Sequence, residues 1–108
     1  MKRKSVHLYA HIRRARRLLE LYWFVIRLAV PCPFHYMALR EGGIKFVRVE
    51  CACQGKKLTS DPMVLITMPV PAGAVKEVWF FPAGWEQWEI RPVPVQLEEE
   101  WQRLYSKN

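Results

Sequence analysis

Apolar side chains near the N-terminus recur at helical spacing. Successive members of this apolar stripe are four, three, four and three positions apart: Leu8, Ile12, Ala15, Leu19 and Tyr22. This spacing places all of its members on one face of an α-helix. Ser5 has the side chain of an N-cap. The pattern therefore predicts an amphipathic helix from Ser5, with residues 1–4 as a flexible basic N-terminus.

The stretch Trp23–Val30 is apolar and rich in β-branched residues, with Arg27 as its one charged member. Such a run is typical of a strand that is buried on both faces. Pro31 and Pro33 follow and cannot continue a strand ladder. We therefore expect a strand that is buried everywhere except at Arg27.

A hairpin is predicted for Phe34–Cys53. Its arms are Phe34–Arg40 and Ile44–Cys53, and Glu41-Gly42-Gly43 form the turn, since glycine tolerates the positive φ of tight hairpin turns. Side chains alternate between the two faces of a strand. One face of the second arm should therefore carry Lys45, Val47, Val49 and Cys51, and the other Phe46, Arg48, Glu50 and Ala52. On the first arm, His35, Met37 and Leu39 should share a face.

The rest of the chain predicts further elements. Ser60-Asp61-Pro62 has the residues of a helix start, and it precedes a short helix at Met63–Met68. Val75–Phe81 reads as a strand and Trp85–Val93 as an edge strand, with a C-terminal helix and tail within residues 95–108. The order of elements predicts a single domain over residues 1–108, of the α/β class, with a mixed sheet of about five strands.

The net charge of +7 is concentrated near the N-terminus. Residues 1–27 carry eight basic groups and a single acid, Glu20, whereas the remaining residues balance at nine and nine. Such a concentration favours a phosphate-rich partner or an anionic membrane surface; the alternative is a solvated helix face in a basic protein. Charged residues and prolines interrupt the longest apolar run, so no membrane span is expected. The three cysteines and the absence of a secretory signal indicate a reducing cytoplasm without a disulfide framework.

These elements resemble the archaeal-type Holliday junction resolvases of the PD-(D/E)XK, or restriction-endonuclease-like, superfamily. The resemblance covers roughly Ser5–Val93: the first helix with YWFVIRLA, the hairpin FHYMALREGGIKFVRVECACQGK, and the strands AVKEVWFFPAGWEQWEIRPV. It implies a nuclease-like fold, a Mg²⁺-dependent endodeoxyribonuclease activity and a homodimer.

The positions that the family uses for catalysis are occupied by other residues here. The resemblance places His11 at the helix Glu, His35 at the hairpin Asp, and Arg48 and Glu50 at the Glu and Lys of the second arm. Mg²⁺ prefers carboxylate and other oxygen ligands, and Arg48 puts a positive charge where the family holds the metal. The chain contains a single Asp, Asp61, which lies outside the hairpin. We therefore expect no metal cofactor and no metal-dependent cleavage.

Two functions remain open at this level. The first is a catalytically inactive, resolvase-like domain that binds duplex or branched DNA. Arg48, His11 and His35 would contact phosphate, and further backbone contacts would come from Arg13, Arg14, Arg16, Arg17, Lys56 and Lys57. The second is a protein-interaction or regulatory subunit, either a homodimer or paired with an active nuclease. Its interface would use some of the five Trp residues, which are otherwise core.

A structural zinc site is a third, weaker hypothesis. Its ligands would be Cys32, His35, Cys51 and Cys53, which have suitable donor atoms but no standard spacing. The alternative is that the cysteines are small buried hydrophobic residues.

Overall fold

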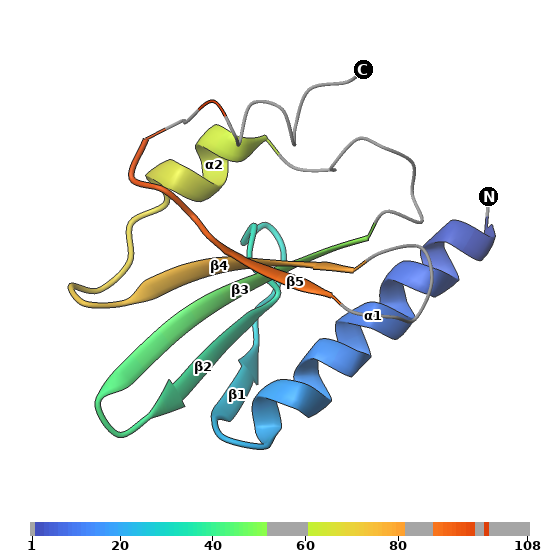
Figure 1. Ribbon diagram of the computed structural model, residues 1–108, viewed down its shortest axis with the longest axis horizontal. Coiled ribbons are helices and arrows are strands. Elements are labelled where there is room, and N and C mark those ends of the chain that lie inside the picture. Colours follow the sequence, from blue (N-terminus) through green and yellow to red (C-terminus); the bar gives the residue numbers. More distant parts are fainter. Residues whose placement is uncertain (1, 52–60, 82–87, 97–98, 100–108) are drawn as a thin grey trace.

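The fold is a five-stranded sheet with two helices (Figure 1). The computed structural model describes residues 2–51, 61–81, 88–96 and 99, with side chains from residue 8 onward. The elements are α1 (Lys2–Glu20), β1 (Phe24–Arg27), β2 (Tyr36–Arg40), β3 (Gly43–Cys51), α2 (Pro62–Thr67), β4 (Val75–Phe81) and β5 (Glu89–Pro92). Neither helix has the length and apolar character needed to cross a membrane, within the part of the chain described.

The sheet is mixed, and its strands lie in sequence order from β1 to β5. Neighbouring strands are antiparallel except β3 and β4, which are parallel. Parallel neighbours require a crossover connection, and α2 lies within it. The predicted α/β class and mixed sheet of about five strands are confirmed.

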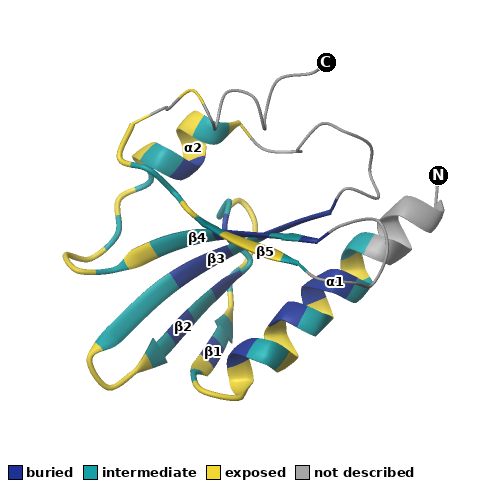
Figure 2. Ribbon diagram, viewed as in Figure 1, coloured by how far each residue is buried: buried dark blue, intermediate teal, exposed yellow. Residues whose placement is uncertain are grey.

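One face of the sheet is covered by α1. Ile12, Ala15 and Leu19 are buried against Val47, Val49 and other residues of the sheet. Figure 2 shows buried positions of α1 alternating with exposed ones along the helix. The predicted stripe is confirmed except at Tyr22, which is 73% exposed because the helix ends at Glu20.

The opposite face carries a second core beneath α2, formed by Phe34, Phe46, Leu65 and Val78. The Asp61 side chain accepts a hydrogen bond from the Met63 amide, so Asp61 is the N-cap and Pro62 is the first helical residue.

The other end of α2 is held by a lysine from the sheet. Lys76 Nζ donates to the carbonyl oxygens of Leu65 and Ile66 at 2.8 and 2.9 Å. These carbonyls belong to the last turn of the helix, where no intrahelical N–H reaches them. Lys76 therefore fixes α2 to β4.

The hairpin is confirmed and joins β2 to β3, but with other bounds: β2 begins at Tyr36 and Gly43 belongs to β3, while residues 52–53 of the predicted second arm lie outside the described residues. Arg40 pairs with Gly43, and Gly42 has a φ of 80° in the turn. The two faces of β3 also follow the predicted alternation: Val47 and Val49 pack under α1, whereas Phe46 packs under α2.

Two sequence predictions were wrong. Ser5 lies inside α1, which begins at Lys2. The strand predicted for Trp23–Val30 is limited to Phe24–Arg27, and Phe24 is 68% exposed. The reason is its place in the sheet, because β1 lies at the edge and pairs with β2 on one side. The helix predicted within residues 95–108 falls largely outside the described residues.

Candidate functional site

The hairpin brings three of the singled-out residues together on the α2 face of the sheet: His35, Arg48 and Glu50. Arg48 Nε donates to Glu50 Oε2 at 3.0 Å, and Arg48 Nη1 donates to the Pro33 carbonyl at 2.8 Å. The Val49 amide donates to His35 Nδ1 at 2.9 Å. Residues 35, 48 and 50 thus form one cluster across β3 and the entry to β2.

The cluster is largely closed to solvent. The Glu50 side chain is 1% exposed and the Arg48 side chain 17%. Burial, Arg48 and Arg27 lower the pKa of His35 from 6.5 to about 3. His35 is therefore neutral at physiological pH, with its proton on Nε2, since Nδ1 is a hydrogen-bond acceptor.

This donor set does not fit a catalytic Mg²⁺ ion. The cluster offers one carboxylate, Glu50, and that carboxylate already accepts a hydrogen bond from Arg48. A dication would meet the Arg48 guanidinium within the same cluster. Moreover, no three His, Cys, Asp or Glu side chains of the described segments are grouped as a metal site requires.

His11 does not join this cluster. It is 1% exposed and stacks on Phe81, with ring centroids 4.7 Å apart. Phe81 belongs to the core under α1. Arg48 pairs with Val78 in the register of β3 and β4, and Val78 belongs to the core under α2. His11 and Arg48 therefore lie on opposite faces of the sheet, and a shared phosphate contact by His11, His35 and Arg48 does not form.

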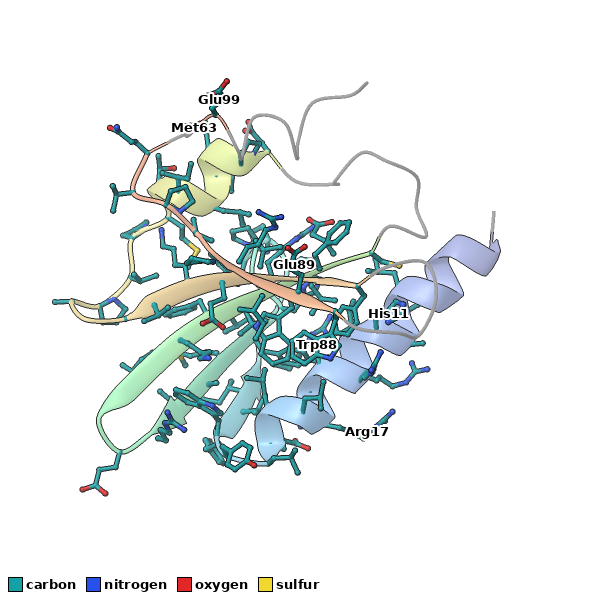
Figure 3. All side chains as sticks on the ribbon, in the orientation of Figure 1. His11, Arg17, Met63, Trp88, Glu89 and Glu99 are labelled. Carbon is teal, nitrogen blue, oxygen red and sulfur yellow. The ribbon has the colours of Figure 1, made fainter. Side chains whose placement is uncertain are left out.

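The basic residues of α1 differ in their exposure. Arg13, Arg16 and Arg17 are exposed, and Figure 3 shows Arg17 extending away from the sheet. Arg16 forms a 2.9 Å ion pair with Glu20. Arg14 is half-buried, with its guanidinium 5.5 Å from the centroid of the Phe81 ring. Lys56 and Lys57 lie outside the described residues.

The cysteines do not supply the ligands of the zinc hypothesis. Cys51 is disulfide-bonded, contrary to the expectation of reduced thiols, so its sulfur is not a thiolate ligand. Cys32 is a half-buried free thiol, and Cys53 lies outside the described residues.

A cluster that the sequence did not predict lies on the α1 face. Trp79 and Trp88 stack with ring centroids 4.6 Å apart. The Trp23 ring packs over Gly43, and two cations lie over it: the Arg40 guanidinium at 3.9 Å and Lys45 Nζ at 4.8 Å from the centroid. Three Trp residues that are far apart in sequence are thus gathered beside the C-terminal end of α1. The tryptophans were evident from the sequence, but nothing in its pattern indicated that these three meet.

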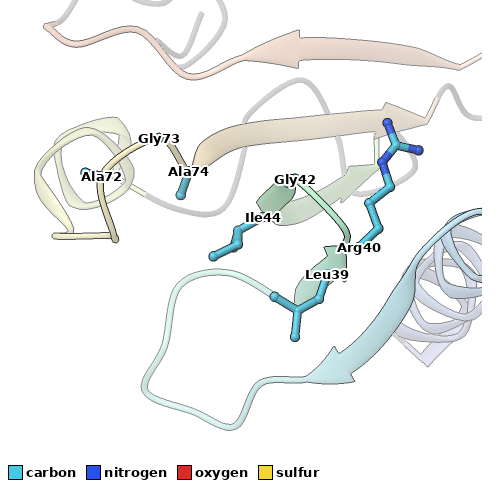
Figure 4. A pocket seen from close by; sticks show the side chains of 8 residues that line it. Leu39, Arg40, Gly42, Ile44, Ala72, Gly73 and Ala74 are labelled. Atoms are coloured by element: carbon cyan, nitrogen blue, oxygen red, sulfur yellow. The ribbon is translucent and has the colours of Figure 1, made fainter.

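A hollow of about 400 Å³ lies between the hairpin turn and the segment that precedes β4 (Figure 4). Leu39, Ile44, Ala72 and Ala74 line it. Arg40 is the one charged residue among its described lining residues, and its guanidinium lies over Trp23. Its described lining residues include no acid, general base or nucleophile.

No known protein family, curated protein or solved structure matches the chain. The assignment of a function therefore depends on the residues and their geometry.

Proposed function

We propose that this protein is a catalytically inactive, resolvase-like domain that binds DNA through the exposed face of α1. The observation that carries the proposal is the position of Arg13 and Arg17. They lie four residues apart on the helix, so they are neighbours on its surface, and both are exposed. Within the described chain, neither forms an ion pair with a carboxylate.

The contact surface differs from the one that the sequence indicated. Arg48 is engaged by Glu50 and by the Pro33 carbonyl, and His35 is neutral, so neither presents a free charge to phosphate. Guanidinium groups at the surface of α1 form charge-assisted hydrogen bonds to phosphate oxygens instead. The donor set of the hairpin cluster, in which the Glu50 carboxylate is engaged by Arg48, supports binding without cleavage.

Salt-dependent DNA binding tests the proposal. Each phosphate contact releases counterions, so the logarithm of the affinity falls linearly with the logarithm of the salt concentration. Arg13→Ala/Arg17→Ala should weaken binding to duplex and four-way-junction DNA and reduce that slope by about 2. The measurement is fluorescence anisotropy over a salt series.

The chain offers a matched control on the same helix. Arg16→Ala/Glu20→Ala removes an exposed ion pair and leaves the net charge unchanged. It should alter binding little. Undetectable DNA binding at low salt would refute the proposal, and equal losses in the two double variants would show that Arg13 and Arg17 are not the contact residues.

A further inference from the structure

We infer that the hollow beside the C-terminal end of α1 is a stacking site for one unpaired base of a single-stranded DNA segment. The inference rests on the proposed function and specifies its substrate class. The hollow has a volume of about 240 Å³. This is below the range of about 300–1,000 Å³ that is usual for drug-sized ligands, so it suits a single planar ring better than an extended molecule.

Aromatic rings form much of the hollow. Trp79, which is 4% exposed, lines it together with Trp23 and Trp88, which are half-buried. Figure 3 shows Trp88 in the layer between the sheet and α1. At the rim, Leu21 and Tyr22 are 67% and 73% exposed. A base that enters can therefore stack on Tyr22 while its edges meet apolar side chains.

The charges around the hollow select an anionic ligand. Lys45 lines it, with its ammonium 3.1 Å from Glu77 and over the Trp23 ring. Arg40 lies over the same ring. Because Glu77 engages Lys45, the cation that a guest would meet is Arg40: a cationic guest of the kind that aromatic cages bind would be repelled by it, whereas a nucleotide brings a negative phosphate.

The helix extends this positive surface. Arg17 lies four residues before Leu21, which is at the rim, and Arg13 four residues before Arg17. Phosphates on either side of the stacked base would then follow α1 in one direction and meet Arg40 in the other. A basic track with an aromatic platform is how proteins bind single strands without sequence preference.

The test compares single-stranded and duplex DNA. Labelled oligothymidylate of about 12 nucleotides and a duplex of equal length are titrated at one low salt concentration. Tyr22→Ala should weaken oligothymidylate binding by about 5- to 100-fold and leave duplex binding within about twofold. Tyr22→Phe, which keeps the ring, should bind like the wild type.

Phe24→Ala is the matched control. Phe24 is an exposed aromatic residue close in sequence to Tyr22, but it does not line the hollow, and strand alternation places it on the other face from Val25, which packs under α1. Both alanine variants should keep the thermal unfolding profile of the wild type.

Two results overturn the inference. If Tyr22→Ala weakens oligothymidylate binding no more than Phe24→Ala, while Arg13→Ala/Arg17→Ala weakens all DNA binding, the stacking site is wrong and the proposed function stands. If no DNA of either form binds to the wild type, both fail.

Discussion

At the scale of single residues, His35 is a titratable group that the fold holds uncharged. Its pKa is about 3 in the folded protein, against 6.5 for an ordinary histidine. Between these pH values the unfolded chain binds more protons than the folded one. His35 therefore lowers the free energy of unfolding as the pH falls from about 6.5 toward 3, by at most about 1.4 kcal/mol per pH unit.

The variant His35→Asn isolates this contribution. Asparagine does not titrate, yet its side-chain oxygen can accept the hydrogen bond that the Val49 amide donates to His35. Urea unfolding at pH 7 and at pH 4.5 should show a smaller loss of stability on acidification for the variant than for the wild type. Equal losses in both proteins would contradict a depressed pKa at His35.

The neighbouring ion pair, Arg48 and Glu50, predicts a large effect of truncation. Arg48→Ala would leave the Glu50 carboxylate, 1% exposed, without its guanidinium partner, so we expect a loss of about 3–5 kcal/mol in the free energy of unfolding. Arg48→Met/Glu50→Leu removes both charges and should reduce the free energy of unfolding clearly less.

The control is Arg16→Ala, at an exposed ion pair, which should reduce the free energy of unfolding by less than about 1 kcal/mol. Denaturant unfolding of all three variants decides the point, and an Arg48→Ala loss as small as that of Arg16→Ala would refute the prediction.

The sequence indicated correctly that these residues share the hairpin, because strand alternation fixes their faces. It could not indicate what Arg48 binds. One of its partners is a backbone carbonyl, that of Pro33, which carries no side-chain signal. Nor could it separate His11 from the cluster, since that separation depends on which face of the sheet α1 covers.

At the scale of elements, α2 depends on a contact from outside the helix. It has six residues, too few for a stable isolated helix, and Lys76 holds two of its last carbonyls. Lys76→Met should reduce the free energy of unfolding by about 1–3 kcal/mol, because it removes charge-assisted hydrogen bonds at a half-buried site. Glu89→Ala, on exposed β5, serves as the control in thermal unfolding. If the two variants lose the same stability, Lys76 does not hold α2.

The bounds of a strand could be predicted where the apolar pattern of the sequence is enough to define them. The bounds of β4 match the prediction, since its apolar and β-branched run is closed by turn residues on both sides. The error at β1 arose because an apolar run is compatible with the centre of a sheet and with its edge. Only the pairing of the strands shows that β1 lies at the edge.

At the scale of the whole molecule, the mixed sheet followed from the order of elements, whereas the aromatic hollow did not. Trp23, Trp79 and Trp88 meet because α1 packs on β1 and β3, so that the residues at its C-terminal end line the same hollow as Trp79 and Trp88. Such a meeting depends on the packing of a helix on a sheet and leaves no periodic signal in the chain. The same packing turns Arg13 and Arg17 outward.

The response to magnesium tests the whole arrangement at once. The one carboxylate of the hairpin cluster is engaged by Arg48, and the net charge is +7, so this cluster offers Mg²⁺ no site that the unfolded chain lacks. The melting temperature should therefore be the same in Mg²⁺ and in EDTA. Mg²⁺ should compete with the basic side chains for the DNA phosphates and so weaken DNA binding. The DNA strands should stay intact. The measurements are thermal unfolding and gel analysis of labelled duplex and junction DNA with Mg²⁺ or Mn²⁺. Because Glu50 is held in an ion pair with Arg48, it should take no part in a cleavage reaction. Cleavage that disappears in Glu50→Ala would therefore identify a working metal site and refute the proposal that the protein is catalytically inactive.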